Sequence, residues 1–357
     1  MKKSLIALAV LAASGAAMAQ SSVTLYGVAD AGVTYLNGAD NWSGVTSGNN
    51  LTSRLGFRGV EDLGGGLKAN FVIEGGFNLD NGDGASGYAG AKAGEGFQFK
   101  RRSTVGLSGG FGEVRMGREL TAAYNATARY DVFGSVGIGQ SRLWADGGVV
   151  DASANATAVT TNQRISNALT YVSPDFSGFK FGLNYGFGET TASNSDSGYL
   201  GAGLTYDNGP LSLGLGLERL NNGANSVAAS DIDAWSLGGS YDFGVAKLLA
   251  GYRESTVDRA AVENKRTGYY VAATAPVGAG TVRVSYNRYE NELGNVTGKA
   301  DQFAIGYVYG LSKRTSVYGT YAYLKNKNGA NLYTLGSGGL KTNGSQQGVQ
   351  VGVSHSF

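Results

Sequence analysis

The side chains available for chemistry in this chain are arginines and carboxylates, because the usual catalytic and metal-binding residues are almost absent. The 357 residues contain no cysteine and a single histidine, His355. A thiolate metal site and a catalytic cysteine are therefore excluded, and most zinc sites and histidine-based reactions would need a partner that the chain lacks. We expect no enzymatic activity, no metal ion and no cofactor.

Charged residues gather around one long connection, which spans residues 119–163 and contains Asp131, Asp146 and Asp151. A stretch of this length without its own structure is usually functional or disordered. The neighbouring arginines are Arg54, Arg58, Arg118 and Arg164. If the connection folds against them, its carboxylates and their guanidinium groups set an electric field that orders water and discriminates solutes by charge and polarity. The alternative is that these charges are only solvated side chains.

The elements that must position these charges are β-strands, because apolar and polar residues alternate along most of the chain. Near residue 215, Leu213, Leu215 and Leu217 alternate with glycine, serine and glutamate. By the same alternation, Arg54 and Arg58 share one face of a strand. A soluble β-sandwich also alternates in this way, so the pattern alone does not choose between a sandwich and a membrane barrel.

The connections decide in favour of an all-β, antiparallel transmembrane barrel, because short and long ones alternate as such barrels require. Short ones are predicted at 61–66, 109–112, 174–178, 207–210, 276–280 and 310–314, and long ones at 37–50, 79–96 and 326–344. Sixteen strands are predicted to begin near residues 23, 51, 67, 97, 113, 166, 179, 198, 211, 232, 246, 265, 281, 300, 315 and 346. A barrel of this size encloses an aqueous lumen, and its many glycines are expected to let the strands curve or to free lumen volume.

The N-terminus predicts export. Lys2 and Lys3 precede a short apolar run, and residues 17–19 (Ala-Met-Ala) have the form of a signal-peptidase site. We expect a signal peptide over residues 1–19 and a barrel over residues 20–357. Loss of the two lysines takes the net charge of +2 to zero, so no nucleic-acid partner is expected. No apolar run is long enough for a transmembrane helix, which leaves the closed barrel as the route into a membrane.

Several motifs together resemble the Gram-negative general porin family, and most closely the porins of β-proteobacteria. They are residues 25–27 (Leu-Tyr-Gly), 53–59 (Ser-Arg-Leu-Gly-Phe-Arg-Gly), 105–112 (Val-Gly-Leu-Ser-Gly-Gly-Phe-Gly), 116–118 (Met-Gly-Arg) and the terminal Phe357. The resemblance runs from residue 21 to the end of the chain. It implies an outer-membrane diffusion channel for ions and small hydrophilic solutes, a homotrimer, and a third loop folded into the lumen as a constriction.

The resemblance also implies roles for particular residues. Arg54, Arg118 and Arg164 fall where the family's motifs place a basic cluster on the wall, and strand alternation adds Arg58. The expected acidic side consists of Glu119, Asp131 and Asp146, although the Pro-Glu-Phe-Gly-Gly stretch of enterobacterial relatives is missing. Phe357 resembles the C-terminal signal read by the outer-membrane assembly machinery. The remaining expected partners are outer-membrane lipid and lipopolysaccharide.

Three other functions compete with the passive channel. A substrate-specific channel of the same fold is expected to show an aromatic track along the lumen, for which Tyr289 and Tyr318 are the candidates. An outer-membrane enzyme needs a histidine with suitable partners, and His355 lies on the apolar face of the last strand. An adhesin or autotransporter barrel would carry a large passenger domain. The passive channel therefore ranks first and the specific channel second.

Overall fold

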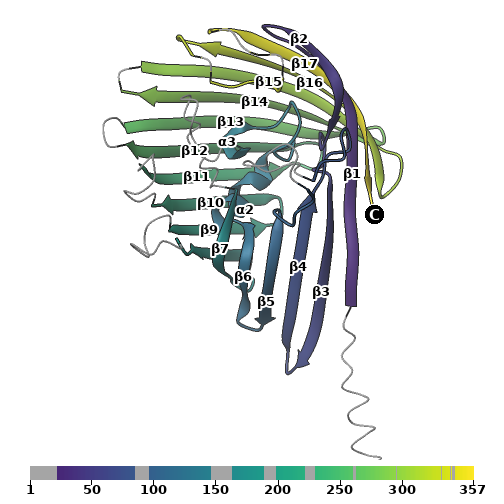
Figure 1. The fold of residues 1–357 in the computed structure, drawn as a ribbon, viewed down its shortest axis with the longest axis vertical. Helices are drawn as coiled ribbons and strands as arrows, with labels where there is room; N and C mark the ends of the chain where they lie inside the picture. The colour runs from purple at the N-terminus through teal and green to yellow at the C-terminus, as the bar shows by residue number, and fades with distance from the viewer. Residues whose placement is uncertain are drawn as a thin grey trace, which may run out of the picture.

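The computed structural model describes residues 22–84, 96–145, 163–188, 198–221, 230–259, 263–294, 296–330, 332–337, 339 and 342–357. In this part of the chain, β-segments that follow one another pair antiparallel, except that β2 and β3 both pair with β1, and β17 returns to pair with β1, which closes the sheet into a barrel (Figure 1). The segments are β1 (Ser22–Asn37), β2 (Asn41–Ser47), β3 (Arg54–Gly64), β4 (Leu67–Gly76), β5 (Arg102–Gly109), β6 (Gly112–Leu120), β7 (Arg164–Val172), β8 (Phe179–Gly186), β9 (Tyr199–Asn208), β10 (Leu211–Leu220), β11 (Ser230–Asp242), β12 (Lys247–Arg259), β13 (Glu263–Val277), β14 (Gly280–Leu293), β15 (Val296–Gly310), β16 (Thr315–Lys327) and β17 (Ser345–Ser356).

The segments make sixteen strands around the barrel, as predicted, because β2 and β3 are two halves of one strand. Both pair with β1: β2 along residues 31–37 of β1, and β3 along residues 22–28. Between them residues 48–53 leave the wall and fold around the buried carboxylate of Asp30, which accepts the N–H groups of Asn49 (2.8 Å) and Leu51 (3.0 Å). The predicted loop over residues 37–50 was therefore wrong for residues 41–47, which continue the sheet.

The predicted alternation separates an outer apolar face from a polar lumen face. On β17, Val351 is 58% exposed on the outside, whereas the neighbouring Gln350 is 3% exposed and makes hydrogen bonds inside the barrel. On β10, Leu217 is exposed and Glu218 is buried in the same way. Facing walls cross each other in Figure 1, where β9–β15 run across the strands β1 and β3–β5, because the strands of a barrel are tilted to its axis.

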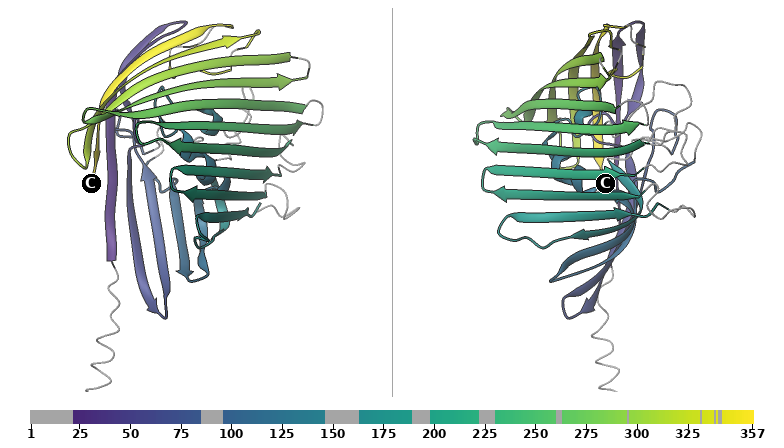
Figure 2. Two further views of the ribbon diagram at one scale, coloured as in Figure 1. Left: turned by 180° about the vertical axis from the view of Figure 1, so that it is seen from behind. Right: turned by 90° about the vertical axis from the view of Figure 1, so that its left-hand side faces the viewer.

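The two ends of the barrel differ. The tight turns after β3, β5, β9 and β13 lie at the end that also holds Ser22 and Phe357, and the longer connections lie at the other end. Outer-membrane barrels have short periplasmic turns and longer extracellular loops, so the termini mark the periplasmic end. Figure 2 shows the two ends from the side. Among the described residues, no helix has the length and apolar character needed to cross a membrane.

The apolar core lies inside the barrel, between its wall and the connection from β6 to β7, which we call L3 (residues 121–163). The described part of L3 contains α2 (Ala122–Thr127), the 3-10 turn η1 (Ala128–Tyr130) and α3 (Arg142–Ala145). Tyr130 and Trp144 of L3 are almost fully buried against wall residues of β12–β15, and Phe133 and Ile138 are buried against residues of β1, β15 and β16. Burial of each large apolar side chain contributes roughly 1.5–3 kcal/mol, so L3 is packed firmly onto the wall.

Candidate functional site

A group of arginines lines the lumen at those ends of the segments β3–β7 that point toward the extracellular side. Arg54 is the first residue of β3, Arg102 the first of β5 and Arg164 the first of β7, and Arg101 immediately precedes β5. These arginines therefore come from neighbouring strand ends and lie at a similar height in the barrel. Arg54 and Arg164 were predicted from the sequence, whereas Arg101 and Arg102 were missed, because a strand start near residue 97 placed neither at a strand end.

Glu74 of β4 is the carboxylate that holds this group together. Arg101 forms an ion pair with it (Nε–Oε1, 2.7 Å), and Arg54 lies at 3.7 Å from its second oxygen. The hydroxyl of Tyr26 donates to the same oxygen at 3.0 Å. Arg164 joins through the backbone, because its Nε donates to the carbonyl of Arg101 at 2.9 Å. Two guanidinium groups thus share one carboxylate and a third lies beside them, which leaves this part of the wall positively charged.

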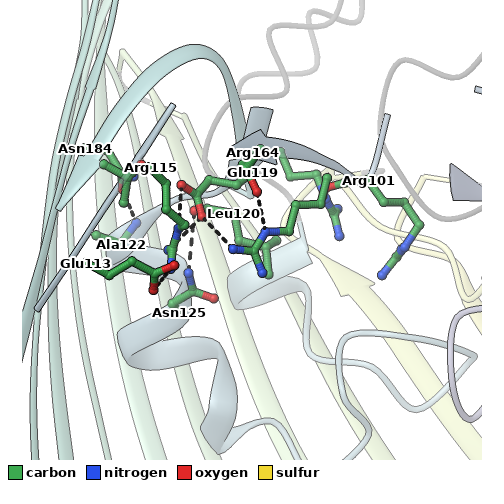
Figure 3. A network of polar contacts seen from close by, with 12 residues as sticks. Arg101, Glu113, Arg115, Glu119, Leu120, Ala122, Asn125, Arg164 and Asn184 are labelled. Carbon is green, nitrogen blue, oxygen red and sulfur yellow. Dashed lines mark hydrogen bonds and ion pairs between the residues drawn. The ribbon is translucent and has the colours of Figure 1, made fainter. Parts of the chain in front are cut away.

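Glu119 lies on the same wall, not across from it. It is buried at the end of β6, where it forms ion pairs with Arg115 (2.7 Å) and Arg102 (3.8 Å). Arg115 also pairs with Glu113 at 2.8 Å. Figure 3 shows Glu119 between Arg115 on one side and Arg101 and Arg164 on the other. The structure therefore brings this predicted acidic residue together with the arginines of the wall.

The other two predicted basic residues lie beside this group. Arg58 follows Arg54 on the lumen face of β3, with its guanidinium 5.3 Å from the ring centre of Tyr26. Arg118 donates to the carbonyl of Lys100 (2.6 Å) and to the hydroxyl of Ser166 (2.7 Å). These bonds tie the ends of β6 and β7 to the segment that leads into β5.

L3 enters the lumen through a short helix with a well-formed start. Thr121 caps α2, because its hydroxyl accepts the N–H of Tyr124 at 3.2 Å. The N–H of Ala122 donates to the amide oxygen of Asn184 on β8, and Thr127 bonds with Ser236 of β11 at 3.0 Å. Both ends of α2 are thus fixed to the wall, and α2 lies inside the barrel in Figure 1.

Glycines of the wall form the surface on which L3 rests. A Cβ at Gly203 or Gly214 would overlap the backbone carbonyl of Ala122 or Ala126, respectively. Further glycines in contact with L3 are Gly182, Gly216, Gly238, Gly251, Gly268 and Gly306. The sheet register places Gly182, Gly203 and Gly216 side by side, and likewise Gly214, Gly238 and Gly251. We call this set the glycine seat. The lumen volume that these glycines free is occupied by L3.

Asp131 has a different environment from the one predicted. Its carboxylate is buried and accepts the backbone N–H groups of Phe133 (3.0 Å), Ser135 (2.9 Å) and Ser141 (2.9 Å). Burial raises its pKa, while these three donors and the guanidinium of Arg283 lower it. The structure thus places Asp131 within L3, where it braces the fold of the loop. The third predicted acid, Asp146, lies outside the described residues.

We call the lumen surface formed by Arg54, Arg101, Arg102 and Arg164 the arginine wall. The side chain of L3 that lies near it is the phenol of Tyr124. Burial raises the pKa of the Tyr124 hydroxyl, and the nearby guanidinium groups of Arg164 and Arg101 lower it in part. Within residues 121–145 of L3, Asp131 is the only carboxylate. The described L3 therefore presents little negative charge to the arginines. No sequence signal identified Tyr124, because its position depends on how α2 docks.

Comparison with known proteins agrees with this architecture. Residues 5–329 match the model of the Gram-negative porin family. The chain is 44% identical to outer membrane porin protein 32 of Delftia acidovorans, with both chains covered completely. An outer membrane porin of Bordetella pertussis is 34% identical over 91% of this chain and 95% of its own. Among solved structures, the anion-selective porin from Comamonas acidovorans has a TM-score of 0.82 at 40% identity, covering 95% of this chain and all of that one.

The chain belongs to the Gram-negative porin family. It is an outer-membrane porin, a general diffusion channel and not an enzyme, as the sequence predicted. OmpT of Vibrio cholerae, solved in a trimer form, has the same fold, with a TM-score of 0.67 at 17% identity over 94% of this chain and 99% of that one.

Proposed function

We propose that this porin favours anions, and that its constriction lies between the arginine wall and L3. The observation that carries the proposal is the sharing of Glu74 between Arg54 and Arg101, with Arg164 bonded to the backbone of Arg101 beside them. A positive wall attracts anions and repels cations in a narrow aqueous space. The described part of L3 offers no exposed carboxylate to cancel this field, because Asp131 is buried. The similar porin from Comamonas acidovorans is anion-selective, which supports the same sign here.

Within this proposal the predicted residues take different parts. Arg54 and Arg164, with Arg101 and Arg102, supply the positive potential. Arg58 extends it along β3, and Arg118 holds the strand ends. Glu119 and Asp131 fix the geometry of the wall and of the loop, in place of forming the negative side of the field. Asp146 is a candidate for that negative side.

The substrate-specific alternative is not favoured by the two lumen aromatics that suggested it. Tyr289 and Tyr318 are both almost fully buried. Tyr289 accepts the N–H of Arg142 in L3, and Tyr318 donates to Asp30. Neither ring offers a face on which a sugar can stack.

The remaining parts of the proposal concern assembly. Residues 1–19 act as a signal peptide that is removed on export, and the mature barrel forms a homotrimer. Phe357 is the signal recognised by the assembly machinery; its backbone N–H and carbonyl pair with Gly27, which places it at the seam between the last strand and the first. The mass of the purified protein in mild detergent tests the trimer prediction, and the mass of a monomer would contradict that prediction.

The test of selectivity is the reversal potential of the purified protein in a planar bilayer under a salt gradient. Wild type is expected to prefer anions. The variant Arg54→Gln with Arg164→Gln loses two charges at the wall and is expected to lose most of that preference. The control is Lys313→Gln with Arg314→Gln, which removes two exposed charges from the periplasmic turn after β15. An unchanged reversal potential in the wall variant would overturn the proposal.

A further inference from the structure

A buried carboxylate outside the arginine wall, that of Asp30 on β1, organises a turn that the charged constriction does not explain. Asp30 is fully buried, and residues 48–53, which join β2 to β3, fold around its side chain. We call these residues the inner turn, because they leave the paired wall on the lumen side. Burial of a charge is costly unless hydrogen-bond donors surround it. The inner turn supplies such donors.

The carboxylate of Asp30 holds the inner turn through its backbone. It accepts three successive N–H groups of the turn: Asn49 at 2.8 Å, Asn50 at 3.3 Å and Leu51 at 3.0 Å. The hydroxyl of Tyr318 on β16 donates to the same carboxylate at 2.8 Å. The backbone N–H of Asp30 also donates to the hydroxyl of Ser53 at 3.1 Å. One residue thus fixes the turn from its second residue to its last.

The inner turn contacts L3 at residues 134–140, which we call the L3 tip. A Cβ on Gly137, whose φ is +66°, would overlap the backbone carbonyl of Asn49, so this close approach requires glycine. The side chain of Asn49 accepts the amide N–H of Gln350 at 2.8 Å, and Gln350 in turn accepts the backbone N–H of Ile138 at 3.3 Å. The turn therefore supports the L3 tip directly and through Gln350.

The L3 tip needs this support because the glycine seat lies elsewhere. The L3 atoms nearest to the seat belong to residues 122–133 and 143–144. Polar contacts of the tip with the wall run through two long amides, Gln350 and Gln302, which donates to the carbonyls of Ile138 (3.1 Å) and Gln140 (3.0 Å). Fixing a glutamine side chain costs rotamer entropy. For Gln350 this cost is met beforehand by Asn49 and Thr34, which both accept its N–H groups.

We propose that Asp30 is a positioning residue for the constriction and that it holds the L3 tip in place through the inner turn and Gln350. The charge of Asp30 acts on the backbone of the turn and not on passing ions, because the carboxylate is buried and accepts four donors. The inference rests on the proposed constriction at L3 and adds how the far end of the loop is held.

The experiment measures the distance between two spin labels by pulsed electron paramagnetic resonance. One label is attached at the L3 tip through Val136→Cys, and the other at the exposed turn after β15 through Lys313→Cys. The natural chain contains no cysteine, so the labels attach only at these two positions. Labelled protein is diluted with unlabelled protein before it is folded in detergent, so that distances within one chain dominate.

The test variant is Asp30→Asn, which keeps the size of the side chain and one acceptor oxygen but removes the charge. We expect the distance distribution to broaden and the displaced tip to become about tenfold more populated, since a buried hydrogen bond to a charged group contributes about this factor. Single-channel recordings of the unlabelled variant should show brief closing events that are more frequent in the same proportion.

The matched control is Asp301→Asn on the outer face of β15. The carboxylate of Asp301 also accepts a tyrosine hydroxyl (Tyr286, 2.7 Å) and forms two ion pairs, with Arg288 (2.8 Å) and Lys327 (2.6 Å). Its loss should leave the tip distance and the closing frequency as in wild type, whatever it does to the unfolding midpoint. Equal broadening in both variants would show that a general loss of stability moves the tip, and would overturn the inference.

A second variant keeps the test decisive if Asp30→Asn fails to fold. Asn49→Ala leaves the backbone donors of Asp30 in place and removes the contact with Gln350, so it should broaden the distribution in the same direction. An unchanged distribution in Asn49→Ala, or in a folded Asp30→Asn, would overturn the inference.

The reversal potential separates this inference from the proposed selectivity. A shift in Asp30→Asn alone, without movement of the tip, would mean that Asp30 acts on ions by its charge, and would overturn its positioning role. Broadening in both variants of a channel that lacks anion preference would support the inference and contradict only the proposed selectivity.

Discussion

The two halves of the lumen wall direct different residues into the lumen, and these residues have different roles. From β8 to β13 many of the inward positions under L3 are glycines, and the loop packs so closely that a Cβ at several of them would overlap it. From β3 to β7 inward positions near the extracellular ends of the segments carry arginines that share few carboxylates. A constriction therefore needs a surface that supports the loop, here the glycine seat, as well as a charged wall. Small residues set how far the loop intrudes, and guanidinium groups set the field in the space that remains.

The two halves of the wall are also linked to each other through L3. Asn184 of β8 receives the N–H that starts α2, while Glu119 at the end of β6 precedes that helix by only a few residues and is fixed by Arg115. Arg283 of β14 holds the far part of the loop through the carbonyl of Val132 (3.2 Å) and the ring of Phe133 (4.7 Å). Both halves therefore hold L3, and substitutions confined to one half test the contribution of that half alone.

The largest effect is expected from substitution within the glycine seat. Gly203→Val with Gly214→Val forces side chains into the backbone of α2, and overpacking of this kind costs about 1–3 kcal/mol per site. The thermal unfolding midpoint in detergent should fall, and the single-channel conductance should change because L3 no longer rests on the wall. Gly319→Val is the control, since a Cβ there meets no atom within 4 Å. Normal conductance and stability in the double variant would show that the seat does not position L3.

A smaller effect, confined to selectivity, is expected in the arginine half. Glu74→Gln removes the negative charge shared by Arg54 and Arg101 but keeps one oxygen as an acceptor. Removal of a unit charge about 4 Å from a passing ion changes the energy of that ion by ~1 kcal/mol in water. The reversal potential should shift toward a stronger anion preference, with little change in conductance at high salt, where charges are screened. A shift toward cations would refute the assignment of this wall as the positive side.

The smallest effect on conduction and selectivity is expected from Asp131→Asn in L3. The amide keeps one acceptor oxygen, so it can still bind Ser135 and Ser141 but loses the N–H of Phe133, a cost of about 1–3 kcal/mol. Because burial raises the pKa of Asp131, the stability that its carboxyl supplies is present at low pH and falls as the pH rises through the folded-state pKa. The difference in unfolding midpoint from wild type should therefore narrow with rising pH.

The matched control for this variant is Asp242→Asn, because Asp242 also accepts a backbone N–H (Gly244, 2.8 Å) but lies in an exposed turn. It should leave stability nearly unchanged. An ion selectivity altered by Asp131→Asn as strongly as by Glu74→Gln would instead place Asp131 at the pore surface.

Local sequence patterns were sufficient to define the wall of this protein. Strand alternation depends only on neighbouring residues, because successive side chains point to opposite faces, and turn residues mark where each strand ends. The sixteen strands, the apolar face that contains Leu217, the family and the outer-membrane location all followed from such local patterns. The exception was residues 41–47, where polar composition suggested a loop although pairing with β1 makes a strand.

The interior, in contrast, depended on tertiary contacts. The partners of Asp131 lie within a fold of L3 that no periodic pattern encodes, and the glycine seat exists because barrel closure and strand register bring glycines of separate strands together. Glu74 lies on β4, and its contact with Arg101 joins residues 27 positions apart in sequence across a long connection. Charges of this kind can be identified in a sequence. Which of them meet depends on long-range packing, so the balance between arginines and carboxylates at the constriction is a property of the folded barrel.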